Sequence, residues 1–156
     1  MTRCDSYKIK CPLCGNKVRV ILYDTINATL SPKKREELLQ GKINVVECPS
    51  CKKIFKVGKT LLYHDMERNF MVWYYPFESI KHQKFFDEFS ADGHLNDDPA
   101  LVEEEIPEYT KNVHYVFSMD EMVRYIIFRE KLTKVKKKTI GIFDTNKLPT
   151  TLRSGY

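Results

Sequence analysis

The sequence predicts an α+β fold: an antiparallel β-sheet with a helical insertion, and C-terminal helices packed on that sheet. Three observations predict it. Two Cys-Pro-x-Cys motifs lie between segments that read as strands, the stretch between the motifs contains a helix signal, and the apolar period changes to about 3.6 residues after Pro76. We expect a ribbon over residues 1–76 with a helical insertion at about 32–40. A helical C-terminal part over 77–132 and a basic, partly flexible tail over 133–156 follow.

The composition is that of a folded protein. Of 156 residues, 42% are hydrophobic and 12% aromatic, which excludes an intrinsically disordered chain. The first ten residues are polar, and the longest apolar run, residues 70–77, is too short to cross a bilayer. The sequence therefore predicts a soluble, unsecreted, cytoplasmic protein without a membrane partner.

The elements of the first half follow from local patterns. Residues 17–20 alternate between polar and apolar side chains, which predicts a strand that continues to Tyr23. Ser31 suits a helix N-cap, Pro32 the first helical position, and Gly41 the position that follows a helix. Further strands are predicted at residues 43–47, 54–57, 61–63 and 70–75, the last of them central because it is apolar on both faces.

In the second half, four side chains at helical spacing predict a helix over residues 80–89: His82, Phe85, Phe86 and Phe89. An acidic link with two prolines follows, and residues 114–117 are a strand candidate. Ser118 and Glu121 form a capping-box pattern, which predicts a helix from there to about Leu132. A short lead-in strand at residues 7–10 precedes the first cysteine.

Four of the five cysteines stand in the two motifs: Cys11, Cys14, Cys48 and Cys51. Two Cys-x-x-Cys turns supply pairwise the four soft ligands that tetrahedral zinc requires. Gly15 allows the first turn to curl under the metal, whereas Lys52 stands at the equivalent place in the second. A left-handed lysine costs about 1 kcal/mol, against roughly 10–16 kcal/mol for binding of a structural zinc ion. The pattern predicts one zinc ion in a closed, zinc-ribbon-like Cys4 site.

Other uses of these cysteines stay open. Rubredoxin-like iron shares the ligands and geometry, so iron is a less favoured occupant. A thiol oxidoreductase would place the first thiolate at a helix N-terminus, but residues 18–20 alternate as a strand does. A catalytic zinc ion would keep one position open, which four cysteines close.

Residues outside the motifs give no catalytic set. His64 and Asp65 are neighbours on a predicted strand, so they point to opposite faces and are expected to cap a turn. Cys4 lies seven residues before Cys11 and is expected to be a bystander. No phosphate loop, nucleophile elbow or carboxylate pair is present, so no enzymatic activity is predicted.

Charge is distributed in blocks along the chain. Residues 1–76 carry 14 Lys and Arg against 7 Asp and Glu, residues 77–112 carry 3 against 10, and residues 113–156 carry 9 against 4. These blocks either neutralise one another in the fold or present a basic surface to an acidic partner, the first being favoured. The roles of the ribbon lysines and of residues 134–138 stay open, and nucleic acid is only weakly supported as a partner.

The chain resembles the CpXC domain family, named for its two Cys-Pro-x-Cys motifs. Beyond the cysteines, the resemblance rests on residues 26–28, 36–39, 41, 44, 61–66 and 115–118, and covers roughly residues 9–132. Two departures are Lys52, where the family usually has glycine, and Arg124-Tyr125, where it tends to have an acidic residue and a lysine. The family is prokaryotic and of uncharacterised function, so the resemblance implies the metal site and a shared fold but no activity.

These observations predict a zinc-binding, non-enzymatic interaction module that meets a protein partner. The alternatives are a rubredoxin-like iron electron carrier, a thiol oxidoreductase using the same cysteines, and a nucleic-acid-binding zinc ribbon.

Overall fold

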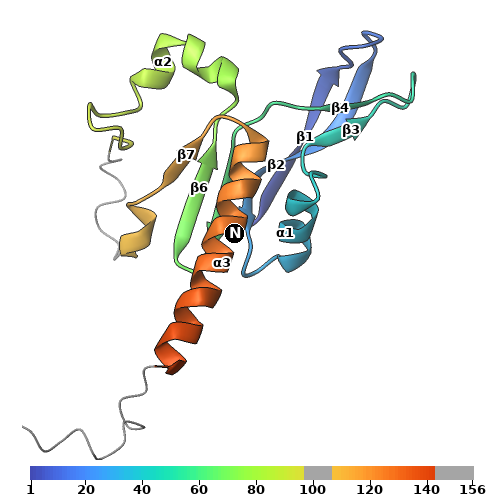
Figure 1. Ribbon diagram of the computed structural model, residues 1–156. Coiled ribbons are helices and arrows are strands. Elements are labelled where there is room, and N and C mark those ends of the chain that lie inside the picture. The colour runs from blue at the N-terminus through green and yellow to red at the C-terminus, as the bar shows by residue number, and fades with distance from the viewer. Residues whose placement is uncertain (97–106, 143–156) are drawn as a thin grey trace, which may run out of the picture.

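The computed structural model describes residues 1–96 and 107–142, with side chains to residue 136. Its main sheet has five strands in the order β1-β2-β5-β6-β7 (Figure 1). Their bounds are β1 Arg3–Lys10, β2 Lys17–Asn27, β5 Leu61–Asp65, β6 Phe70–Tyr74 and β7 His114–Val116. A second sheet pairs β3, Val45–Glu47, with β4, Ile54–Lys56.

The α+β class is confirmed, and the main sheet proves to be mixed. The β1–β2 and β5–β6 pairs are antiparallel, whereas β2–β5 and β6–β7 are parallel. Parallel neighbours need a long crossover connection. Residues 28–60, which hold a helix and the β3–β4 hairpin, provide the first crossover, and residues 75–113 provide the second. The sequence prediction of an antiparallel sheet missed these long-range pairings.

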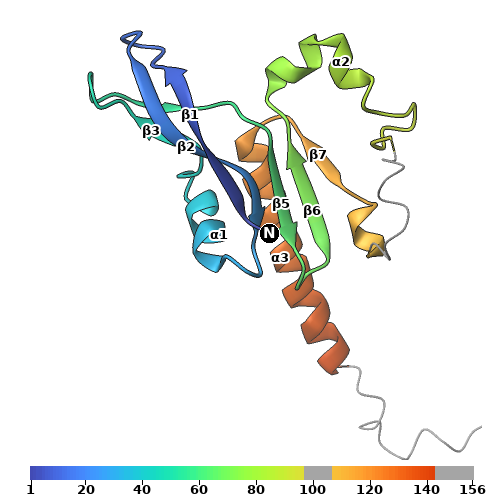
Figure 2. The same ribbon diagram turned by 180° about the vertical axis from the view of Figure 1, so that it is seen from behind.

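Two helices cover one face of the main sheet: α1, Pro32–Leu39, and α3, Met119–Ile142 (Figures 1 and 2). Leu38 of α1 and Met122 and Ile126 of α3 are fully buried against the sheet. An ion pair between Arg35 of α1 and Glu130 of α3, with two hydrogen bonds, joins the two helices. The predicted insertion at 32–40 and the predicted packing of a C-terminal helix on the sheet are both confirmed.

Most buried apolar side chains of the described residues form two separate clusters. The main core lies between the sheet and the two helices and comprises Ile26, Ala28, Leu38, Ile43, Leu61, Tyr63, Phe70, Val72, Tyr74, Val116, Met122 and Ile126. The smaller ribbon core lies between the β1–β2 and β3–β4 hairpins and comprises Cys11, Val18, Val20, Leu22, Val46 and Cys48. Strand β2 contributes to both, so it connects the ribbon to the body of the protein.

Several boundaries differ from the sequence prediction, three of them by more than a few residues or in kind. The helix predicted over 80–89 is replaced by a 3₁₀ helix, η1 Phe77–Lys81, and a short α2, Gln83–Phe86, because His82 between them has an extended backbone. Strand β1 is longer than the predicted lead-in, because it pairs with β2 along its whole length. Helix α3 continues past Leu132 to Ile142, so the first part of the predicted tail is helical, and residues 143–156 lie outside the described residues.

The capping pattern at the start of α3 forms as predicted. The Glu121 N–H donates to the Ser118 hydroxyl at 3.1 Å, and the Glu121 carboxylate accepts from the Phe117 N–H at 3.2 Å. A further short element, η3 Glu108–Thr110, precedes β7. Within the described ranges, none of the helices combines the length and the apolar composition needed to cross a membrane.

Candidate metal centre

The first knuckle, residues 11–16, joins β1 to β2. The Cys11 N–H donates to the Asn16 carbonyl at 2.9 Å, and the Gly15 N–H donates to the Cys11 carbonyl at 2.9 Å. Gly15 has a φ of 73°, in the left-handed region that glycine adopts without steric cost. These bonds turn the chain back on itself, so both cysteines of the motif point to the same side.

The second knuckle, residues 48–53, joins β3 to β4 with the same hydrogen bonds. The Cys48 N–H donates to the Lys53 carbonyl at 2.9 Å, and the Lys52 N–H donates to the Cys48 carbonyl at 2.8 Å. Lys52 has a φ of 59°, so it takes the place of Gly15 at the cost of a left-handed backbone. The two knuckles therefore share one backbone geometry despite the different residue.

The knuckles bring four sulfurs together in the cysteine cluster, which comprises Cys11, Cys14, Cys48 and Cys51. All four Sγ atoms lie within 4.8 Å of one another. The Sγ atoms of Cys11 and Cys51 are 3.8 Å apart, and those of Cys14 and Cys48 are 3.7 Å apart. A tetrahedral ion with bonds of about 2.3 Å sets its ligands about 3.8 Å apart, so the residues fit a metal of this kind. All five cysteines, Cys4 included, are free thiols, without a disulfide.

Burial and hydrogen bonding make the four thiols unequal. Cys11 and Cys48 are buried, whereas Cys14 is exposed. The backbone N–H groups of Cys51 and Ser50 donate to the Cys48 sulfur and lower the pKa of this thiol to about 6. The N–H of Asn16 lowers the pKa of Cys14, but desolvation and the three neighbouring thiols outweigh it and raise that pKa to about 12.

These opposite shifts follow from the crowding of the four sulfurs. Four thiolates at this spacing would repel one another, so without a cation Cys14 keeps its proton, while Cys48, whose sulfur accepts two backbone hydrogen bonds, ionises most easily. A divalent cation removes that repulsion and displaces the remaining protons. The arrangement can therefore bind one metal ion through four thiolates, with no ligand position left for water or substrate.

Asn44 positions the second knuckle relative to the first. Its side-chain oxygen accepts from the Tyr23 N–H at 2.8 Å, and its side-chain amide donates to the Tyr23 carbonyl at 3.1 Å. The Asn44 carbonyl accepts from the Val57 N–H at 2.8 Å, next to β4. One buried side chain thus fastens the β3–β4 hairpin to β2. The sequence offered a signal, because asparagine tolerates a positive φ, here 55°, and its amide imitates a backbone amide.

The other candidate residues lie apart from the cluster. Cys4 is exposed on β1, opposite Tyr23. The Asp65 carboxylate caps the β5–β6 turn, accepting from the Arg68 N–H at 3.0 Å and its guanidinium at 2.8 Å. His64 does not share this cap. Its Nε2 lies 2.9 Å from the Tyr109 hydroxyl, and burial lowers the pKa of this histidine. The sequence prediction that His64 and Asp65 do not pair with each other agrees with these contacts.

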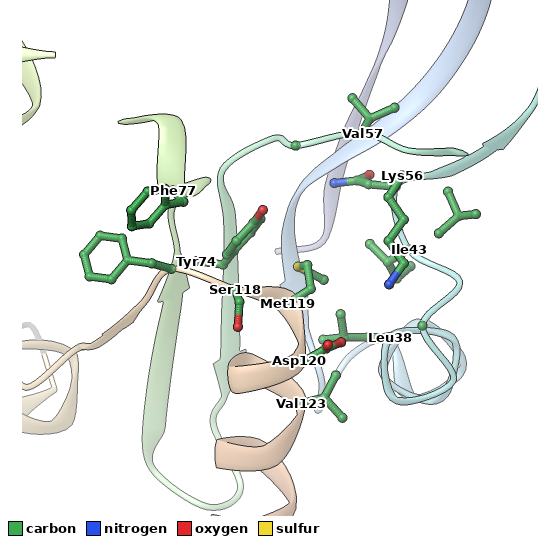
Figure 3. A pocket seen from close by; sticks show the side chains of 15 residues that line it. Leu38, Ile43, Lys56, Val57, Tyr74, Phe77, Ser118, Met119, Asp120 and Val123 are labelled. Atoms are coloured by element: carbon green, nitrogen blue, oxygen red, sulfur yellow. The ribbon is translucent and has the colours of Figure 1, made fainter. Parts of the chain in front are cut away.

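A half-open groove of about 320 Å³ lies between α1, the β3–β4 hairpin and the start of α3 (Figure 3). Leu38, Ile43, Met119 and Val123 form much of its apolar lining. The described residues that line the groove include no histidine and no cysteine. The hydroxyl of Ser118 is engaged in capping α3. The groove therefore lacks a nucleophile with an adjacent base, and it is separate from the cysteine cluster.

One comparison with known proteins gives a match. Searches of curated proteins and of solved structures returned no match. The model of the CpXC protein family matches residues 9–136, a range that contains both knuckles, both cores and most of α3. The chain therefore belongs to the CpXC protein family, and its four motif cysteines form a cluster able to bind a metal ion.

Proposed function

We propose that this protein is a zinc-binding, non-enzymatic interaction module of the cytoplasm, in which the cysteine cluster is a structural site. The observation that carries the proposal is the convergence of four sulfurs within 4.8 Å from two knuckles of equal geometry. Thiolate-only, tetrahedral surroundings favour zinc among the common cellular metals, with iron as the competing occupant.

The surroundings of the cluster support a structural role. The ribbon core holds few side chains, and the β3–β4 hairpin shares no sheet with β1–β2. A metal ion held by two cysteines from each hairpin would contribute the linkage that this small core lacks. A structural site of this kind supplies roughly 10–16 kcal/mol of apparent binding free energy, far more than a few buried valines.

The elements that follow the two knuckles give less support to thiol–disulfide exchange as the function of these cysteines. A reactive first cysteine is usually activated at the N-terminus of a helix. Here each knuckle is followed by a strand, β2 after the first and β4 after the second. Neither motif therefore has a helix dipole available to its thiolates.

The proposal is tested by elemental analysis of the purified full chain, together with its visible absorption spectrum. We expect one zinc ion per chain and no absorption in the visible range. Cys48→Ser should lose most of the metal, whereas the control variant Cys4→Ser, which removes an exposed cysteine outside the cluster, should retain one ion.

Three results would contradict the proposal. One is a coloured protein that bleaches on reduction, which indicates iron in four thiolates. Another is a protein that is isolated without metal and with disulfides inside the cluster. The third is equal metal loss in both cysteine variants, which indicates adventitious binding.

A further inference from the structure

The β1–β2 hairpin has one face that is exposed along its length. Val18, Val20 and Leu22 belong to the inner face, on which the β3–β4 hairpin packs. Because side chains alternate along a strand, the residues between them form the outer face. Its exposed part comprises Cys4, Ser6, Lys8, Lys10, Lys17, Arg19 and Ile21, whereas Tyr23, which continues this face opposite Cys4, is half-buried against the main core. Figure 2 shows that this hairpin projects beyond the rest of the main sheet.

The strand register places cations of the outer face directly opposite one another. Lys8 lies opposite Arg19, and Lys10 lies opposite Lys17. Directly opposed residues have their Cβ atoms about 5 Å apart, and successive pairs on one face are about 6.8 Å apart. The result is a compact grid of four positive charges. Like charges at this spacing destabilise a hairpin, so the grid opposes folding.

No carboxylate of the described residues pairs with the cations of this grid. The outer face carries no carboxylate, and all four cationic side chains are exposed. None of them forms an ion pair or a side-chain hydrogen bond within the described residues. The charges are therefore available to an external anion.

The negative charge of the metal site offsets only part of the positive charge of the four cations. A divalent ion with four thiolates carries a charge of −2 beside Lys10 and Lys17, so the four cations and the site together keep a charge of +2, and all four cationic side chains stay exposed for contact. Lys8 lies three residues along β1 from Cys11, about 10 Å, and Arg19 lies directly opposite Lys8, so both are about this far from the cluster. That distance exceeds the Debye length of about 8 Å at physiological ionic strength, so screening removes most of the attraction.

We propose that the outer face of the β1–β2 hairpin binds the phosphodiester backbone of a double-stranded nucleic acid, without sequence preference. This inference rests on the proposed interaction function and names the partner class for one surface of the module. The backbone is a regular line of negative charges, and the grid is a regular array of cations with four contacts to offer.

The composition of the face favours nucleic acid over the protein partner that the sequence analysis expects. Protein–protein interfaces have an apolar centre and are depleted of lysine, whereas interfaces with nucleic acid are more polar and strongly positive. Ile21, 65% exposed at the edge of the grid, is the only large aliphatic side chain of the outer face. The aromatic residue of this face, Tyr23 opposite Cys4, is half-buried against the main core with Lys34 over its ring, so no exposed ring stands beside the four cations for base stacking, which favours a double strand over a single strand.

Fluorescence anisotropy of labelled duplexes, titrated with the full metal-loaded chain, tests the inference. Mixed-sequence DNA and RNA duplexes are compared between about 50 and about 200 mM salt. With four phosphate contacts, the slope of log affinity against log salt is expected near −4. The double variant Lys8→Gln, Arg19→Gln should reduce the slope to about −2 and weaken binding at low salt about tenfold or more.

The matched control is Lys33→Gln, Lys84→Gln, which removes the same charge from exposed lysines of α1 and α2. It should leave the slope near −4. Thermal stability provides a second readout, because removing the opposed charges should leave the Lys8/Arg19 variant as stable as the parent or more stable. A loss of binding in that variant then cannot be assigned to unfolding.

Four results would overturn the inference. They are no binding to either duplex at low salt, an equal loss in the control variant, polyglutamate binding as tight as duplex binding, and preferential binding to anionic phospholipid vesicles. Each of these results, obtained with a folded chain that carries one metal ion, would contradict nucleic-acid binding and would not contradict the structural metal site. A preference for DNA or for RNA identifies the source of the backbone and supports the inference.

Discussion

At the scale of single residues, the two knuckles differ at one backbone position. Gly15 and Lys52 both have a positive φ, and only glycine adopts it without cost. A Cβ atom built on Gly15 would have no neighbour within 4 Å. Any effect of a side chain there therefore reports the backbone conformation and not a steric clash. Lys52 holds the same left-handed backbone with a side chain, so the free energy of unfolding is lower than it would be with glycine at this position.

Lys52→Gly is expected to raise the free energy of unfolding of the metal-loaded protein by about 1 kcal/mol, because it relieves the left-handed lysine. Gly15→Lys is expected to lower it by about 1–2 kcal/mol for the converse reason. Chemical denaturation at fixed free metal concentration measures both. Equal changes of the same sign in the two variants would refute the equivalence of the knuckles.

Asn44 is a second single residue that supports the ribbon, because its side chain fastens the β3–β4 hairpin to β2. It is buried, it has a positive φ, and its amide exchanges two hydrogen bonds with the backbone of Tyr23. Removing the amide takes these partners from the N–H and the carbonyl of Tyr23, which lie in a partly buried place on β2. Each such loss typically costs about 1–3 kcal/mol.

Asn44→Gly, which keeps the backbone conformation and removes both bonds, should lower the free energy of unfolding by about 2 kcal/mol. Asn44→Ala should cost about 1 kcal/mol more, because alanine also resists the positive φ. Denaturation of the two variants beside the parent separates the side-chain and backbone contributions. If glycine is tolerated as well as asparagine, the amide bonds to Tyr23 contribute little, and if alanine costs no more than glycine, the positive φ carries no penalty.

At the scale of elements, the β3–β4 hairpin is the least secured part of the ribbon. Its strands have three residues each and pair only with one another. Asn44, the ribbon core and the cysteine cluster connect it to β2. By contrast, β5, β6 and α3 contribute to the main core, which has no cysteine among its buried residues.

Chelation of the metal should therefore release the β3–β4 hairpin before it affects the body of the protein. Hydrogen exchange measured by mass spectrometry should show faster exchange in both knuckles and in β3 and β4. The amides of β5, β6 and α3 should keep their protection. Loss of protection throughout the chain at once would show that the two cores do not unfold separately, and unchanged exchange in the knuckles would show that the metal is dispensable.

At the scale of the whole molecule, the sequence predicted the features that depend on local chemistry. The cysteine spacing predicted the cluster, and the Ser118–Glu121 pattern predicted the start of α3. The signals from Ser31 to Gly41 predicted the bounds of α1, although the Ser31 side chain makes no capping hydrogen bond and bonds Thr2 instead. Each of these signals is carried by a few neighbouring residues, in a knuckle or at the end of a helix. Such signals are readable without knowledge of the fold.

The features that could not be predicted from the sequence depend on contacts between distant segments. The parallel pairing of β2 with β5 joins segments separated by a helix and a hairpin, which no local pattern encodes. The apolar period over 80–89 suggested one helix, but Phe86 is 50% exposed and the chain is extended at His82. There, aromatic contacts of Phe85 with Tyr75 replace a continuous helical face.

The central claim is that the four motif cysteines hold one zinc ion in a closed shell. X-ray absorption at the zinc edge of the purified full-length protein tests it most directly. We predict four sulfur neighbours at about 2.3 Å and no nitrogen or oxygen neighbour. A shell with three sulfurs and one lighter atom, or the absence of zinc beside an iron edge with four sulfurs, would contradict the claim.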